Sequence, residues 1–140
     1  MDKICCSPFY QVLMTQDKDE KRRAFLKWCE GLENFASCVV DGGFYKSDRV
    51  NIVDFAVYPW VHRMFVVEHF TGGELKLYMD LEWARRLTAW KSRMDDRASV
   101  SETNADPMRL IKEGYRRYWE RTADTLVGDA VRAGKEAHDI

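Results

Sequence analysis

The sequence predicts an all-α helical bundle in a single domain, and three observations carry that prediction. Apolar residues recur at steps of three and four in four separate stretches of the chain. The 140 residues are enough to enclose one continuous core. Glycine and proline are scarce, with 8 and 3 residues, whereas a turn-rich all-β domain needs more of both.

The first fifteen residues predict part of a helix. Phe9, Tyr10, Leu13 and Met14 form an apolar face that follows Pro8. Because this helix opens so close to residue 1, we expect the chain to be cut from something longer, with its first helix truncated.

The stretch from Asp17 to Val40 predicts an amphipathic helix. Phe25, Leu32 and Val39 mark its apolar stripe, and charged residues occupy the opposite face. We therefore expect this helix to lay one side on a core and to expose the other.

The residues after this helix allow two interpretations. Residues 38–45 contain two short apolar runs around an Asp-Gly pair, which is the pattern of a β-hairpin. An isolated two-stranded hairpin is only marginally stable in water. We therefore favour a loop, in which Gly42 and Gly43 end the helix and Phe44 and Tyr45 pack against the core.

The most informative stretch is residues 51–68. It is apolar nearly all round, so we expect a central helix that is enclosed on most sides. Asn51 and Asp54 have the spacing of a capping box, in which each side chain accepts a hydrogen bond from the other's backbone amide. Such a cap is worth about 1–2 kcal/mol. Pro59 is expected to bend the helix.

Two further helices are expected after a break at a Thr-Gly-Gly sequence. The third apolar stretch covers about residues 75–94. The fourth covers about residues 106–126, and Asp106 followed by Pro107 is the pattern of a helix start.

The remaining segments have weaker periodicity. Residues 95–105 are polar, so we expect an exposed connection there. Residues 128–140 are small and charged, which is typical of a frayed surface helix. We therefore divide the chain into a helical domain, residues 1–127, and a C-terminal tail, residues 128–140.

Composition excludes several function classes. Lys and Arg number 22 against 23 Asp and Glu, so no overall positive field attracts nucleic acid or an anionic membrane. The longest apolar stretch, from Ile52 to Trp60, is far shorter than the ~20 residues that cross a bilayer. Asp2 and Lys3 do not fit a signal peptide. We expect a cytoplasmic protein with no membrane or nucleic-acid partner.

Cysteine and histidine spacing argues against a metal site. The four cysteines are Cys5, Cys6, Cys29 and Cys38, and none forms a C-x-x-C pair. His62 and His69 are seven residues apart, which is not a metal-ligand spacing. A redox role for the adjacent Cys5 and Cys6 would need a general base close in the sequence, and none is present. We expect reduced thiols.

One segment resembles a known family. Residues 41–64 read DGGFYKSDRVNIVDFAVYPWVHRM and resemble the capping-box helix in the C-terminal domain of cytosolic glutathione transferases. The continuation Tyr58-Pro-Trp-x-x-Arg63 is most similar to omega-class enzymes and related bacterial and fungal members. Residues 7–17 resemble the passage from the first to the second helix of that domain. The resemblance extends over about residues 3–126.

The resemblance implies both a fold and an activity of a longer parent protein. The fold is the helical bundle of the transferase C-terminal domain, with the N-terminal thioredoxin-like domain missing. The parent would be an omega-like thiol transferase, a homodimer that uses glutathione as co-substrate and acts on a hydrophobic small molecule or a thiol. The catalytic residue and the glutathione site lie in the missing domain, so we name no catalytic residue and expect no cofactor on this chain alone.

The resemblance also suggests substrate-binding residues. Arg63, Met108 and Tyr115 would approach the cleft that holds the second substrate. Two plainer interpretations stay open: Arg63 pairs with a carboxylate at the end of the bundle, and Met108 and Tyr115 pack in the core. Asn51 and Asp54 are expected to act as a structural cap and not as catalytic groups.

A second function shares the same fold. Helical domains of this type also serve as non-enzymatic assembly modules, beside translation elongation factor subunits and some aminoacyl-tRNA synthetases. A thioredoxin-like unit encoded ahead of Met1 would favour the enzyme over the assembly module.

Overall fold

A computed structural model describes residues 2–137, and it is 65% helical with no strand in that range. The all-α prediction is therefore confirmed. The helical elements in chain order are η1 (Asp2–Cys6), α1 (Ser7–Met14), α2 (Lys18–Ser37), α3 (Ile52–His62), α4 (Met64–Phe70), α5 (Glu82–Asp95), α6 (Ala98–Ser101), α7 (Pro107–Arg109), η2 (Leu110–Tyr115), α8 (Arg116–Trp119) and α9 (Leu126–Arg132). The two η elements are π-helical turns.

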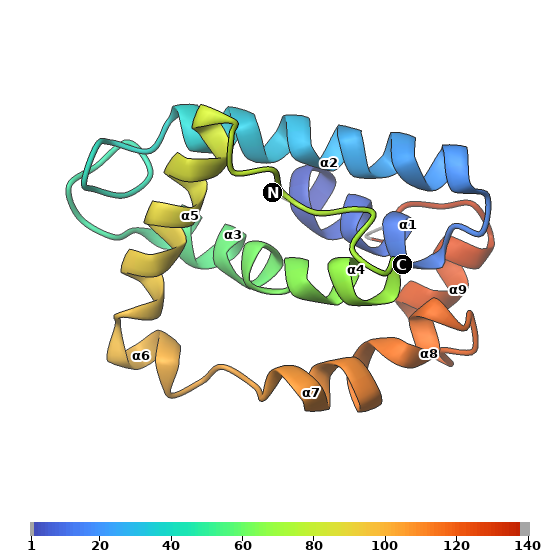
Figure 1. Cartoon of the computed structure of the whole chain (residues 1–140). Helices are drawn as coiled ribbons and strands as arrows, with labels where there is room; N and C mark the ends of the chain where they lie inside the picture. The colour runs from blue at the N-terminus through green and yellow to red at the C-terminus, as the bar shows by residue number, and fades with distance from the viewer. Residues whose placement is uncertain (1, 138–140) are drawn as a thin grey trace.

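The helices surround a central pair, α3 and α4, which follow one another across the middle of the molecule (Figure 1). Helix α2 runs along one side, and α5 crosses one end of the molecule to pack against both α2 and α3. Helix α1 packs against α2, α4, α8 and α9. No helix between residues 2 and 137 is long and apolar enough to span a bilayer.

Helix α2 confirms the prediction for residues 17–40, although it ends at Ser37. Asp17 is its N-cap, because the Asp17 carboxylate accepts a hydrogen bond from the backbone amide of Glu20 at 2.8 Å. Phe25 and Leu32 are buried one above the other on the core face, together with Trp28, as helical periodicity requires.

The segment between α2 and α3 is a loop, as predicted. Only two isolated bridges form in it, between Val39 and Tyr45 and between Phe44 and Ser47. Gly43 is required at its position, because a Cβ atom there would lie 2.7 Å from the Ser47 carbonyl oxygen.

The capping box of α3 forms and is tied to two other parts of the fold. Asn51 accepts a hydrogen bond from the Val53 amide at 2.9 Å, and Asp54 Oδ2 accepts one from the Asn51 amide at 2.9 Å. Asp54 Oδ1 accepts two more, from the Tyr45 amide at 2.9 Å and from the Trp90 indole at 2.8 Å. The fully buried Asp54 carboxylate therefore connects the preceding loop, α3 and α5.

The expected central helix is interrupted at Arg63, so that it forms two successive helices. Pro59 offers no N–H to the carbonyl of Phe55, and α3 gives way to α4 at Arg63. The prediction of enclosure on most sides holds for the middle and end of this pair but is wrong for its first turn. There Ile52 is 80% exposed and Phe55 is 40% exposed.

The third helix begins seven residues later than its apolar pattern predicts. Residues 75–81 form no helix, and α5 starts only at Glu82. Gly72 and Gly73 both have positive φ angles, 61° and 83°, and lead the chain out of α4 into an irregular segment. Leu75 and Leu77 pack against the core from that irregular segment, so their apolar character does not require a helix.

The fourth helix starts where predicted but is shorter and irregular. Asp106 caps it, accepting a hydrogen bond from the Arg109 amide at 2.8 Å. The π-helical turn η2 then changes the register of the helix, which ends at Trp119 and not near Leu126. Arg121, with φ of 59°, follows this end.

Helix α9 occupies the start of the expected tail. Thr125 caps it, accepting a hydrogen bond from the Gly128 amide at 3.0 Å, and Ala130 is buried. The division between residues 127 and 128 therefore falls inside a helix.

The connection at residues 95–105 is less exposed than expected. It contains α6, whose Val100 is buried in the core. Asn104 donates a hydrogen bond to the Tyr58 hydroxyl at 2.7 Å, so a polar interaction inside the fold also holds the segment.

Candidate functional site

Five polar side chains from three parts of the chain meet beside α3, and we call them the polar network. They are Tyr58 and His62 from α3, Lys91 and Asp95 from α5, and Asn104 from the segment after α6. The Tyr58 hydroxyl donates to Asp95 at 2.5 Å and accepts from Asn104 at 2.7 Å. Lys91 donates to the other oxygen of Asp95 at 2.7 Å.

The charges of the polar network are set by these hydrogen bonds. Burial raises the pKa of Asp95, but the hydrogen bonds from Lys91 and Tyr58 outweigh it and lower that pKa overall. Burial and the bond donated to Asp95 raise the pKa of Tyr58 to about 12. At neutral pH the network therefore holds an ionised Asp95 and a protonated Tyr58.

His62 is held as a neutral imidazole of one tautomer. Burial lowers its pKa, the positive charges of Lys91 and Arg63 lower it further, and Asp95 opposes them. His62 Nδ1 lies 3.2 Å from the Tyr58 hydroxyl, whose single proton is donated to Asp95. Nδ1 must therefore be the donor, and Nε2 carries an unshared electron pair. Nε2 is buried and has no hydrogen-bond partner within residues 2–137.

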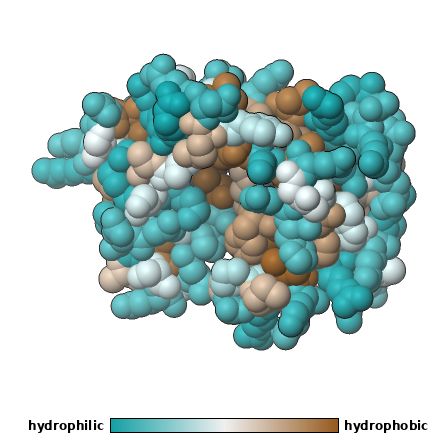
Figure 2. Space-filling view, viewed as in Figure 1, coloured by the Kyte–Doolittle hydropathy of each residue, from teal (hydrophilic) through white to brown (hydrophobic). Residues whose placement is uncertain are grey.

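Two hollows flank His62, and it lines both. The larger, of about 700 Å³, lies against α4, α5 and α7, and it includes Phe65, Met108 and Ile111. The smaller, of about 240 Å³, includes Arg63 and Asn104. On the face that Figure 2 shows, hydrophobic residues gather toward the middle and hydrophilic residues surround them. A ligand in the larger hollow would contact these apolar side chains, the His62 imidazole, and the polar residues Glu68, Thr88 and Lys91 at its walls.

Arg63 lies at the junction of α3 and α4, next to a group of aromatic residues. Its guanidinium carbon is 5.3 Å from the centroid of the Trp60 ring, a cation–π distance. Burial raises the pKa values of Tyr10 and Tyr115, and the positive charge of Arg63 acts in the opposite direction on both. Within residues 2–137, Arg63 forms no ion pair with a carboxylate, so the arrangement differs from a bundle-end salt bridge.

The three candidate substrate residues do not line one pocket. Tyr115 is 7% exposed and packs in the core, with its ring 5.1 Å from that of Phe9. It does lie close enough to Arg63 to be affected by its charge. Met108 is 50% exposed and lines the larger hollow, while Arg63 lines the smaller one. His62 lines both hollows, so Met108 and Arg63 lie in two hollows that share this one residue.

Sequence reasoning missed most of the polar network. The pairs Tyr58 with His62 and Lys91 with Asp95 are four residues apart, which places each pair on one helix face. That spacing was a usable signal for each pair. Nothing local connects Tyr58 with Asp95, which lies 37 residues away, or with Asn104, which lies 46 residues away.

The residues of this site are better suited to binding a ligand than to catalysing a reaction. No group of three His, Cys, Asp or Glu side chains able to hold a metal ion occurs within residues 2–137. The Tyr58 hydroxyl is locked as a donor to Asp95, so it is not an activated nucleophile. What remains is a mainly apolar hollow with a few polar residues in its lining, among them His62, Glu68 and Thr88, and with Arg63 in the smaller hollow next to it.

Comparison of the chain with protein-family models, with curated proteins and with solved structures found no match. A proposal about function therefore rests on the residues and geometry described above.

Proposed function

We propose that this chain is the helical, substrate-side domain of a glutathione transferase-like protein, with an omega-like thiol transferase as parent. In that protein a thioredoxin-like domain supplies glutathione and the catalytic residue, and this domain supplies one wall of the cleft for the second substrate. The observation that carries the proposal is the position of Arg63. This arginine of the Tyr-Pro-Trp-x-x-Arg motif lies beside a hollow at the end of the capping-box helix, with no carboxylate partner in the described chain.

The larger hollow supports a hydrophobic substrate. Its volume of about 700 Å³ lies within the range of about 300–1,000 Å³ that small-molecule sites occupy. Phe65 and Met108 provide apolar contact area, and the flexible thioether of Met108 adapts to ligands of different shape. A ligand that enters this hollow exchanges water for apolar side chains, which favours alkyl and aryl groups.

The charge of Arg63 supports a substrate with an anionic end that lies in the smaller hollow, because the larger hollow is lined by both Glu68 and Lys91. Arg63 lines the smaller hollow, and its charge is not neutralised by a carboxylate within residues 2–137. Lys91 is already paired with Asp95, so it is less available to a ligand. A thioether of glutathione has both features, an apolar S-substituent and carboxylates.

The experiment is calorimetric titration of the chain with glutathione and with its S-methyl, S-butyl and S-hexyl thioethers. Burial of one methylene is worth about 0.8 kcal/mol, so affinity should rise about two- to fourfold for each methylene that enters the open hollow. Glutathione itself should bind no tighter than about 1 mM, because its own site is in the other domain.

Matched variants locate the effect. Met108→Gln should reduce the gain per methylene, whereas Leu126→Gln, at another exposed apolar residue that lies outside the hollow, should leave it unchanged. Arg63→Gln should weaken the whole series by a similar factor, about two- to fivefold, the worth of a partly exposed ion pair.

Two results would contradict the proposal. One is an affinity that does not depend on alkyl length, and the other is micromolar binding of unmodified glutathione. If no thioether binds at all, the assembly module of the same fold becomes the better interpretation.

A further inference from the structure

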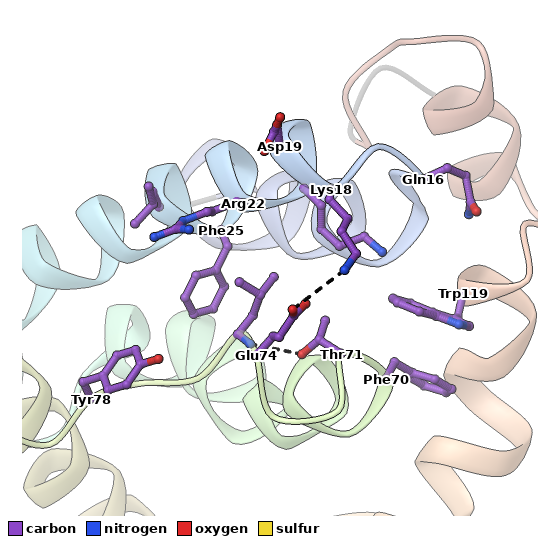
Figure 3. A pocket seen from close by; sticks show the side chains of 13 residues that line it. Gln16, Lys18, Asp19, Arg22, Phe25, Phe70, Thr71, Glu74, Tyr78 and Trp119 are labelled. Carbon is purple, nitrogen blue, oxygen red and sulfur yellow. Dashed lines mark hydrogen bonds and ion pairs between the residues drawn. The ribbon is translucent and has the colours of Figure 1, made fainter.

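A third hollow, of about 620 Å³, lies apart from the two beside His62. The first half of α2, the turn after α4 and Trp119 of α8 form its walls (Figure 3). None of the residues that line it also lines either hollow beside His62. It is therefore a separate candidate site, and the proposed function does not use it.

One end of this hollow is aromatic and apolar. Phe25 of α2 is almost fully buried there, and Tyr78, from the irregular segment before α5, lines the same hollow and is drawn on the same side of it in Figure 3. Leu75 adds an aliphatic surface. Tyr78 is itself 56% exposed, so a planar ring can reach it from solvent, while Phe25 forms the floor at this end.

The other end is built around a lysine. Lys21 Nζ lies 3.9 Å from the centroid of the Trp119 ring, and Trp119 stacks on Phe70 with ring centroids 5.3 Å apart. Glu74 is the nearest acid to influence Lys21, but it forms its ion pair with Lys18, at 3.8 Å. Lys21 thus has no ion-pair partner within residues 2–137.

The charges of the lining favour an anion. Lys18, Lys21 and Arg22 carry three positive charges, and Asp19 and Glu74 carry two negative charges. Burial lowers the pKa of Lys21, because its ammonium group has lost part of its hydration and nearby negative charge does not fully replace it. A carboxylate placed at Lys21 would supply that compensation, and an ammonium group has enough N–H donors to keep its contact with Trp119.

The two ends are one helical turn apart. Lys21 and Phe25 are four residues apart on α2, so their side chains are neighbours on one face, with a rise of about 6 Å between them. An aromatic ring joined to a carboxylate by one or two carbon atoms spans that distance.

We propose that this hollow binds a small aromatic carboxylate, whose anionic group pairs with Lys21 and whose ring packs against Phe25 and Tyr78. The ligand class follows from the lining: a cation that lacks an anion, and aromatic side chains at a distance of one helical turn. The site needs no partner from another domain.

The test is calorimetric titration of the full chain with 1-naphthylacetate and with the neutral analogue 1-naphthylacetamide. The acid should bind about tenfold more tightly than the amide, because only the acid forms the charged pair with Lys21. In ¹H–¹⁵N spectra the indole N–H signal of Trp119, assigned with Trp119→Phe, should shift on addition of the acid. Equal affinity for acid and amide would overturn the proposal, as would an unmoved Trp119 signal.

Variants on α2 separate a binding role from a structural one. Lys21→Met should reduce the preference for the acid to about twofold or less, and Lys21→Arg should retain most of it. Lys27→Met is the matched control, because Lys27 is an exposed lysine of the same helix that does not line the hollow. If Lys27→Met lowers the preference as much as Lys21→Met, the binding is non-specific and the proposal fails.

Discussion

The buried carboxylate of Asp54 predicts a large loss of stability on truncation. Asp54→Ala removes the acceptor for three donors at once, the amides of Asn51 and Tyr45 and the indole of Trp90. Each donor left without an acceptor in a buried place costs about 1–1.5 kcal/mol, since some water can enter the vacated space. The expected loss is about 3–5 kcal/mol, more than the 1–2 kcal/mol that a cap alone is worth.

Asp17→Ala is the matched control. Asp17 is also an N-cap aspartate, but it is exposed and its carboxylate accepts one hydrogen bond, from the Glu20 amide. Its removal should cost about 1 kcal/mol. The two variants therefore compare a cap alone with a cap that also joins separate parts of the fold.

The assay is urea unfolding, followed by circular dichroism for helix content and by tryptophan fluorescence for packing around Trp90. A double-mutant cycle with Trp90→Phe should show a coupling of about 1–2 kcal/mol between Asp54 and the indole. If Asp54→Ala costs no more than Asp17→Ala, the carboxylate does not join the loop, α3 and α5 in the way described.

Two other predictions concern His62 and the loop before α3. The folded-state pKa of His62 lies below 6.5, so the unfolded chain takes up protons first, and the contribution of His62 to stability is lost as the pH falls below about 6.5. The urea midpoint of the wild type should therefore drop when the pH is lowered from about 7.5 to about 5.5. The drop should be smaller in His62→Phe and unchanged in the control variant His69→Gln. Gly43→Ala should lower stability by more than about 1 kcal/mol, because its Cβ would lie 2.7 Å from the Ser47 carbonyl oxygen. Gly114→Ala, whose Cβ atom would lie 3.8 Å from Leu110 Cδ2, should be neutral or stabilising by up to about 1 kcal/mol in thermal unfolding. Equal effects of the two substitutions would contradict the steric argument.

The parts of the fold that sequence predicted well depend on local interactions. The capping box needs only the spacing of Asn51 and Asp54, and the start of α2 needs only Asp17 before an amphipathic pattern. Pro59 lies inside α3, and the helix is interrupted four residues later, at Arg63, so the predicted bend at Pro59 itself stays a prediction. For both caps the deciding contact lies within about one helical turn.

The parts that were predicted poorly depend on distant or irregular contacts. Periodicity placed Leu75 and Leu77 on a helix, but two glycines with positive φ lead the chain into a non-helical segment from which both residues still reach the core. The π-helical turn η2 changes the register after Met108, and a simple heptad count does not anticipate it.

The candidate site was also predicted only where local sequence determines it. Sequence drew attention to Arg63 through its motif, and the structure places it beside a hollow. The polar network was not visible in the sequence, because Tyr58 finds Asp95 and Asn104 only when α3, α5 and the segment after α6 pack together. Side chains that meet across more than thirty residues leave no local pattern.

The most direct test of the proposed substrate wall is an NMR spectrum of the methionine methyl groups with and without S-hexylglutathione. Met64 and Met108 line the larger hollow beside His62, whereas Met14 and Met94 are buried in the core away from its lining. The account predicts that the methyl signals of Met64 and Met108 shift at saturation while those of Met14 and Met94 stay in place. Binding that leaves the Met64 and Met108 signals unmoved would contradict it.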